Sequence, residues 1–249
     1  MVTERHQIDG ERISVLGIPV SNVNMDRAVD LIDQLVQSGD SHIVTTADSS
    51  GIVIAKSDPE LTTIYKEASL VTPDSYGVVW GLKKAGIRAD RVTGVDLVDR
   101  LFKLSAEKGY RVFLLGAEPG IADAAAERIR LLHPGINIVG THHGYFPATD
   151  DEFVAQEVAP HKPDILIVAM GIPRQEKFIT HTMPIIKAKV GIGVGGTLDV
   201  YSGRAKRAPK LIQKMRMEWL WRVILNPKKL TKTMMLPRFA WMLLTEKKK

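Results

Sequence analysis

The chain has 249 residues, 45% of them hydrophobic, and a formal net charge of +6 at pH 7. This length and composition can bury one large core or two smaller ones, which excludes a mainly disordered protein. The absence of cysteine excludes disulfides, zinc thiolates and a thiol nucleophile.

Short β-branched runs alternate with helical stretches along the chain, as in parallel βαβ units. We expect strands at residues 13–18, 42–46, 69–72, 111–115, 136–139, 165–169 and 190–194. We expect helices at 25–37, 51–56, 59–68, 121–132 and 152–159. We also expect one helix that ends at residue 84 and one that begins at residue 175. The strands are continuously apolar, so both faces of the sheet should be covered. The sequence predicts an α/β fold with Rossmann-like parallel sheet layers and helices on both faces, and a soft internal boundary near residues 103–110.

The last 46 residues differ in composition from the rest. Residues 204–249 hold 14 Lys or Arg against Glu218 and Glu246, a net charge of +12, whereas residues 1–203 carry −6. Three of the four tryptophans also lie in this segment. On a helix, a basic stripe would lie beside an apolar one; the basic residues are Lys206, Lys210 and Lys214, and the apolar ones are Leu211, Met215, Trp219 and Val223. We therefore predict a body, residues 1–203, and a basic amphipathic helical appendage, residues 204–249, that binds an anionic membrane surface.

Two other interpretations of the basic segment stay open. The helix could fold onto the acidic body with its apolar stripe in the core. A nucleic-acid groove is disfavoured, because the basic residues are not part of a recognisable binding module. Residues 1–14 have no apolar signal region, and no stretch approaches the roughly 18 apolar residues that span a bilayer. We expect a cytoplasmic protein, peripheral on the inner face of the cell membrane.

Polar and glycine-rich segments follow several expected strands. Ligands of open α/β sheets bind outside the carboxyl ends of the strands, where loops and helix N-termini converge. The candidate residues in these turns are Thr46 and Asp48, Gly116, and Gly195, Gly196 and Asp199. Glycine lets the backbone approach a phosphate closely, although a tight turn or close packing of helix on strand would also explain it.

Further candidates carry charge or an amide. Asp74 follows a proline in a turn, a suitable place for a general base, or else it caps the next helix. Arg174 and Gln175 follow Pro173, which fits a first helical turn and would direct them toward a ligand; helix capping is the alternative. Arg91 is a candidate anion clamp beside Asp96, unless the two form only a surface pair. The histidines have no metal-site spacing and no Asp-x-Asp pair is present, so we predict metal-free chemistry and no cofactor.

Several strings together resemble the WecG/TagA/CpsF glycosyltransferases. They lie at residues 71–77, 91–94, 140–146, 171–178, 195–199 and 207–209, followed by 218–220. The resemblance implies an inverting, metal-independent transfer of a sugar from a UDP-sugar to a polyprenyl-diphosphate-linked sugar in cell-surface polysaccharide synthesis. N-acetylmannosamine or a related hexose is the expected sugar.

The resemblance also implies residue roles. Asp74 matches the catalytic base, Thr46 the active-site threonine, and Arg91 and Gln175 polar residues that line the pocket. The appendage would complete the site and hold it to the membrane, with diphosphate contacts from Arg222, Lys229 and Lys232, the last two in place of family arginines. Asp48 and Ser50 stand where the family usually has Asn and Glu.

Two rival classes and one open question accompany this interpretation. A nucleotide-sugar oxidoreductase or epimerase is disfavoured, because the sequence lacks Gly-x-Gly-x-x-Gly and Tyr-x-x-x-Lys. A non-catalytic membrane-surface or nucleotide-binding adaptor would tolerate replacement of Asp74 and Gln175. Self-association into a homo-oligomer is left open by the sequence.

Overall fold

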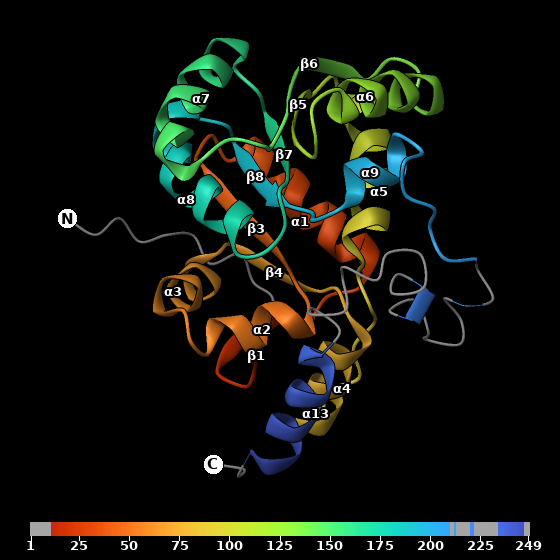
Figure 1. Cartoon of the computed structure of the whole chain (residues 1–249). Coiled ribbons are helices and arrows are strands. Elements are labelled where there is room, and N and C mark those ends of the chain that lie inside the picture. Colours follow the sequence, from red (N-terminus) through yellow and green to blue (C-terminus); the bar gives the residue numbers. More distant parts are fainter. Residues whose placement is uncertain (1–10, 210–211, 213–219, 222–233, 247–249) are drawn as a thin grey trace.

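The computed structural model of the chain describes residues 11–209, 212, 220–221 and 234–246. In this part of the chain, six parallel strands form the main sheet in the order β4-β3-β8-β7-β5-β6 (Figure 1). The strands are β3 (His42–Ala47), β4 (Leu70–Pro73), β5 (Arg111–Gly116), β6 (Asn137–His142), β7 (Ile165–Ala169) and β8 (Val190–Gly193). Helices cover both faces, so the α/β fold predicted from the sequence is confirmed.

Each face of the sheet has its own hydrophobic core. Helices α1 (Met25–Gln37), α5 (Gly94–Lys108), α6 (Ile121–Leu132) and α9 (Thr197–Tyr201) pack on one face, and α7 (Asp151–Val158) and α8 (Arg174–Ile186) on the other. Successive strand residues alternate between the cores: Leu114 lies in the first and Leu115 in the second. Both are fully buried, which explains why the strands read as continuous apolar runs.

The expected strand at residues 13–18 is wrong. These residues belong to a hairpin of β1 (Arg12–Val15) and β2 (Ile18–Ser21), which pair antiparallel. The turn residues Leu16 and Gly17 have φ angles of 52° and 82°. Two consecutive left-handed residues make the tight turn whose twist matches that of a hairpin, so the apolar run reverses direction at this point.

The hairpin and the last described helix share a third core with three helices of the body. These are α2 (Ser49–Ala55), α3 (Pro59–Glu67) and α4 (Tyr76–Lys84), and the last helix is α13 (Met235–Thr245). Phe239 and Leu243 of α13 are buried, and the Lys84 ammonium donates to the carbonyl of Leu243 at the end of α13. In Figure 1, α13 lies beside α4 and α2. The segment after residue 203 therefore contains a helix that packs on the body.

The expected basic stripe is testable at one position only. Lys206 lies in residues 206–209, which have no regular secondary structure, so it belongs to no helix. Pro209 explains this, because a proline disfavours helical conformation of the residue before it and fits the first turn of a helix. The other residues of both stripes, from Lys210 to Val223, lie outside the described residues.

Residues 103–108, where we expected a soft boundary, form the last turns of α5. That helix ends at Gly109, whose φ of 73° is the left-handed conformation that glycine favours. The division of the chain into a body and an appendage remains a prediction.

Candidate active site

Asp74 lies where the carboxyl ends of two strands meet the start of a helix. Its backbone N–H donates to the carbonyl of Ala47 at 2.9 Å, which continues the pairing of β3 and β4. Its Oδ1 accepts a hydrogen bond from the backbone N–H of Gly94, the first residue of α5, at 2.8 Å. The cap of the following helix α4 is Ser75 and not Asp74. The carboxylate is therefore held by an N–H at the positive end of a different helix.

Thr46 is the last residue but one of β3, pairs in register with Thr72 of β4 and is 6% exposed. Its Oγ1 donates to the carbonyl of Gly193 in β8 at 2.9 Å. A Cβ added to Gly94 would lie 3.5 Å from its methyl group, so Thr46 also borders the start of α5. The structure thus brings Thr46 and Asp74 together around Gly94.

Arg91 and Asp96 contact different groups. The guanidinium of Arg91 stacks over the ring of Tyr76, 4.5 Å from its centroid. The Oδ2 atom of Asp96 accepts from Thr93 Oγ1 at 2.5 Å and from Arg207 Nη2 at 2.6 Å. Burial alone would raise the pKa of Asp96, but the hydrogen bonds from Arg207 and Thr93 lower it below its ordinary value. Tyr76 is the first residue of α4, two residues after Asp74, so Arg91 lies near the start of α4.

Gln175 and Arg174 are neighbours in the chain with different surroundings. Gln175 is 1% exposed, and its Oε1 accepts from the backbone N–H groups of Gly171 at 3.0 Å and Gly195 at 2.9 Å. Arg174 instead pairs with Asp151 of α7 through both terminal nitrogens. Gln175 thus joins the loops after β7 and β8, whereas Arg174 connects α8 to α7.

Asp48 and Gly116 have structural roles that their contacts explain, and Gly195 differs from them. Asp48 caps α2, its Oδ1 accepting from the backbone N–H of Gly51 at 2.6 Å. Gly116 has a φ of 141°, and a Cβ there would lie 2.4 Å from the carbonyl oxygen of Ala169. Gly195, by contrast, has a φ of 56° and nothing within 4 Å of an added Cβ.

The rest of the loop after β8 leads directly into α9. Gly196 immediately precedes that helix and Asp199 lies inside it, where the Asp199 carbonyl accepts from the N–H of Ala205 at 2.8 Å. Gly195 therefore leaves open space beside the backbone after β8, whereas a Cβ on Gly196 would lie 3.6 Å from Asp199 Oδ2 and Gly116 allows β5 and β7 to approach closely.

Comparison with known proteins identifies the family of the chain. The sequence model of the Glycosyl transferase WecG/TagA/CpsF family matches residues 13–249. The chain belongs to this family. It is therefore a sugar-transferring enzyme. Two similar proteins, from Bacillus subtilis strain 168 and Staphylococcus aureus strain MRSA252, are both named N-acetylglucosaminyldiphosphoundecaprenol N-acetyl-beta-D-mannosaminyltransferase.

The similarity to these two family members covers nearly all of each protein. The B. subtilis protein is 30% identical over 94% of this chain and 92% of its own length. The S. aureus protein is 30% identical over 100% of this chain and 98% of its own length.

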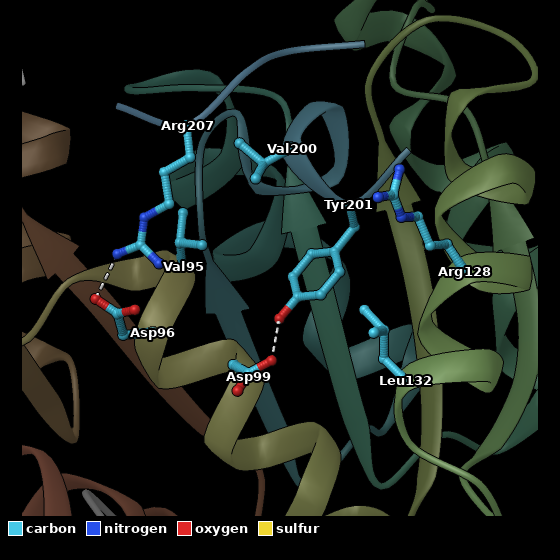
Figure 2. A pocket seen from close by; sticks show the side chains of 8 residues that line it. All are labelled: Val95, Asp96, Asp99, Arg128, Leu132, Val200, Tyr201 and Arg207. Carbon is cyan, nitrogen blue, oxygen red and sulfur yellow. Dashed lines mark hydrogen bonds and ion pairs between the residues drawn. The ribbon is translucent and has the colours of Figure 1, made fainter. Parts of the chain in front are cut away.

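A cavity of about 300 Å³ lies between α5, α6 and α9, and Val95 and Asp96 of the first turn of α5 line it. Figure 2 shows two hydrogen bonds at its wall, from Arg207 to Asp96 and from the Tyr201 hydroxyl to Asp99 at 2.8 Å. Burial and the Asp99 contact raise the pKa of Tyr201 well above its ordinary value. The cavity therefore reaches Asp96 in the first turn of α5 but does not contain Asp74.

Two buried polar residues near the site were missed in the sequence. Glu176 is fully buried and accepts a hydrogen bond from Gln175. Tyr65 is fully buried as well, and burial, followed by the charges of Glu176, Asp48 and Asp74, raises its pKa well above the ordinary value. The adjacent Gln-Glu pair in the motif at residues 171–178 was the available signal for Glu176. Tyr65 lies in α3 and has no local signal.

Part of the predicted site lies outside the described residues: Arg222, Lys229 and Lys232. Within the described ranges, no three His, Asp or Glu side chains are arranged to hold a metal ion. The helices in those ranges are also too short or too polar to cross a membrane.

Proposed function

We propose that this protein is an inverting, metal-independent glycosyltransferase of cell-surface polysaccharide synthesis. It would move N-acetylmannosamine or a related hexose from a UDP-sugar to a polyprenyl-diphosphate-linked sugar. The names of both relatives support this donor sugar and an acceptor of that class. The observation that carries the proposal is the Asp74 carboxylate, which is fixed by Gly94 beside Thr46 at the carboxyl ends of β3 and β4.

Asp74 would act as the general base. Its Oδ1 is held by the N–H of Gly94, and the carboxylate would accept the proton of the acceptor hydroxyl. The hydroxyl oxygen would attack the anomeric carbon of the donor from the face opposite UDP, so the configuration would invert. A positioned base supplies roughly 10²- to 10⁴-fold in rate.

The leaving diphosphate requires positive partners. The open backbone at Gly195 could approach it closely, since a Cβ added there would have nothing within 4 Å. Arg222, Lys229 and Lys232 would bring charge from the appendage, and charge-assisted hydrogen bonds to phosphate are stronger than neutral ones. In this proposal the appendage completes the site.

The same appendage would hold the protein on the inner face of the cell membrane. The exposed side of α13 carries Trp241 and Leu244, each 67% exposed, together with Arg238. Trp80 of the neighbouring α4 is 40% exposed. Tryptophan suits the boundary between water and lipid, and the +12 charge of residues 204–249 would attract anionic lipid.

The test is a transfer assay with a panel of UDP-sugars and a polyprenyl-diphosphate-linked N-acetylglucosamine acceptor, in the presence of excess EDTA. We expect one donor to be used, and NMR of the product to show an inverted anomeric centre. Absence of transfer from every donor would favour the adaptor class. Loss of transfer in EDTA that Mg²⁺ or Mn²⁺ restores would contradict the metal-independent mechanism.

A further inference from the structure

Glu176 is a carboxylate with no exposed surface, one residue after Gln175 in the first turn of α8. Its Oε1 accepts a hydrogen bond from Gln175 Nε2 at 2.8 Å. Buried carboxylates are uncommon, because burial costs free energy unless the group is hydrogen-bonded. Its position beneath the loops of the site requires an explanation beyond packing.

The amide of Gln175 can form hydrogen bonds with all of its neighbours in one orientation only. Gly171 and Gly195 both present N–H donors, at 3.0 Å and 2.9 Å from Gln175 Oε1. A flipped amide would place its NH₂ group against these two donors and its oxygen against the Glu176 carboxylate. The two hydrogen bonds from the glycines would then be lost, since an amide NH₂ group cannot accept them.

The Gln175 side chain also has little room to move. A Cβ on Gly193 would lie 2.6 Å from Gln175 Nε2 and 2.9 Å from its Cδ. The side chain therefore packs directly on the last residue of β8. The Gln175 amide oxygen already accepts hydrogen bonds from the backbone N–H groups of Gly171 and Gly195.

We propose that Glu176 is a positioning residue that fixes the amide of Gln175 and, through it, the loop from Gly193 to Gly196. Gln175 then acts by joining the loops after β7 and β8 and not by direct contact with substrate. The inference rests on the proposed function, because that loop is where the donor diphosphate would bind. Buried hydrogen-bonded pairs of this kind hold a site in its productive geometry.

The first test replaces the carboxylate by an apolar group of similar length, Glu176→Met. We expect amide hydrogen exchange at Gly195, followed by NMR, to rise at least about tenfold. We also expect kcat/KM to fall by about 10²-fold, with a higher KM for the donor, as a misplaced binding loop would cause. Glu176→Gln keeps an acceptor oxygen and should lose less than about tenfold. Glu127→Gln, an exposed position on α6, is the matched control and should match wild type.

A double variant that exchanges the side chains of residues 175 and 176, the reversed pair, separates a positioning role from a simple loss of stability. In Gln175→Glu alone, residue 175 loses the NH₂ group that donates to Glu176, and Gly195 should exchange fast. In Gln175→Glu/Glu176→Gln, the new carboxylate accepts from both glycines and the new amide donates to it. We expect this double variant to restore the slow exchange at Gly195.

Two results would overturn the inference: a folded Glu176→Met protein with wild-type exchange at Gly195, or a reversed pair that exchanges as fast as Gln175→Glu alone. If Glu176→Met does not fold, the reversed pair decides. The exchange measurement does not depend on activity. If the wild-type protein transferred no sugar, the proposed function would fail while the positioning role would still be tested.

Discussion

Arg207 Nη2 donates a hydrogen bond to Asp96 Oδ2 at 2.6 Å. This bond ties the segment after α9 to the first turn of α5 (Figure 2). The N–H of Gly94, in that same turn, binds the carboxylate of Asp74. The start of the appendage is therefore connected to the proposed base through one helical turn.

The first prediction concerns Arg207→Ala. Loss of the hydrogen bond from Arg207 to Asp96 should loosen the first turn of α5. We expect kcat/KM to fall by about tenfold, which corresponds to about 1.4 kcal/mol of transition-state stabilisation. The control is Arg204→Ala, which removes an exposed ion pair with Glu118 and should change the rate less than twofold. Steady-state kinetics of the two variants decide the question. Equal rates for both would show that the Arg207 contact does not reach Asp74.

The second prediction concerns pH and Asp96. The pKa of Asp96 is lowered in the folded protein by Arg207 and Thr93, against the opposing effect of burial. Its contribution to stability is therefore present above its unfolded pKa, about 3.9, and is lost as the pH falls below that value. Asp96→Asn should have a lower free energy of unfolding than wild type at pH 7. This difference should shrink as the pH falls below about 4. Urea unfolding across this range measures it; a constant difference would contradict the assignment.

The third prediction concerns Asp74→Asn. The amide oxygen of asparagine can still accept from Gly94, so the fold should be retained. The amide cannot take up the acceptor proton, and we expect a loss of at least about 10²-fold in kcat. Asp40→Asn, exposed before β3, is the matched control. Circular dichroism and turnover should be measured together, and near-normal turnover of Asp74→Asn would remove this residue from the mechanism.

The sequence predicts most of the sheet because buried parallel strands are continuous apolar runs. The hairpin was missed because Leu16 is an unusual residue for a left-handed turn. Helix α5 was missed although Thr93 caps it and Asp96 N–H binds the Thr93 hydroxyl. Local capping signals of this kind predict where a helix begins but not how far it extends.

The site was predictable as residue types but not as contacts. One partner of Asp74 is Gly94, twenty residues further along the chain, and one partner of Gln175 is Gly195, also twenty residues away. These contacts depend on strand order, because β8 lies between β3 and β7 in the sheet. Arg174 was assigned to a ligand, but sequence could not show that Asp151 of α7 would hold its guanidinium.

The fourth prediction concerns Gly116→Ala. A methyl group there would overlap the backbone of Ala169, which cannot move without distorting β7, and the φ of 141° adds strain. We expect a loss of at least about 2 kcal/mol in unfolding free energy. Gly86 also has a positive φ but open space around an added Cβ, so Gly86→Ala should cost only about 1 kcal/mol. Chemical denaturation of both variants gives the difference, and equal losses would show that β5 and β7 can separate at this point.

The last prediction concerns the apolar surface of α4 and α13. Trp80→Ser/Trp241→Ser should leave the fold intact, because both side chains are exposed. It should weaken binding to anionic vesicles by at least about tenfold, since each lost tryptophan removes apolar surface that would enter the interface. Phe153→Ser is the matched control, because Phe153 is 63% exposed on α7, at the opposite end of the molecule from α13 in Figure 1.

Added salt separates the two contributions to this binding. Wild-type binding should weaken with salt but persist, because the basic charge is screened while apolar burial is not. The residual binding at high salt should be lost in the double tryptophan variant. Vesicle sedimentation at low and high salt measures both effects. If the double variant binds like wild type at high salt, the exposed side of α13 does not face the membrane, and attachment must come from other residues of the appendage.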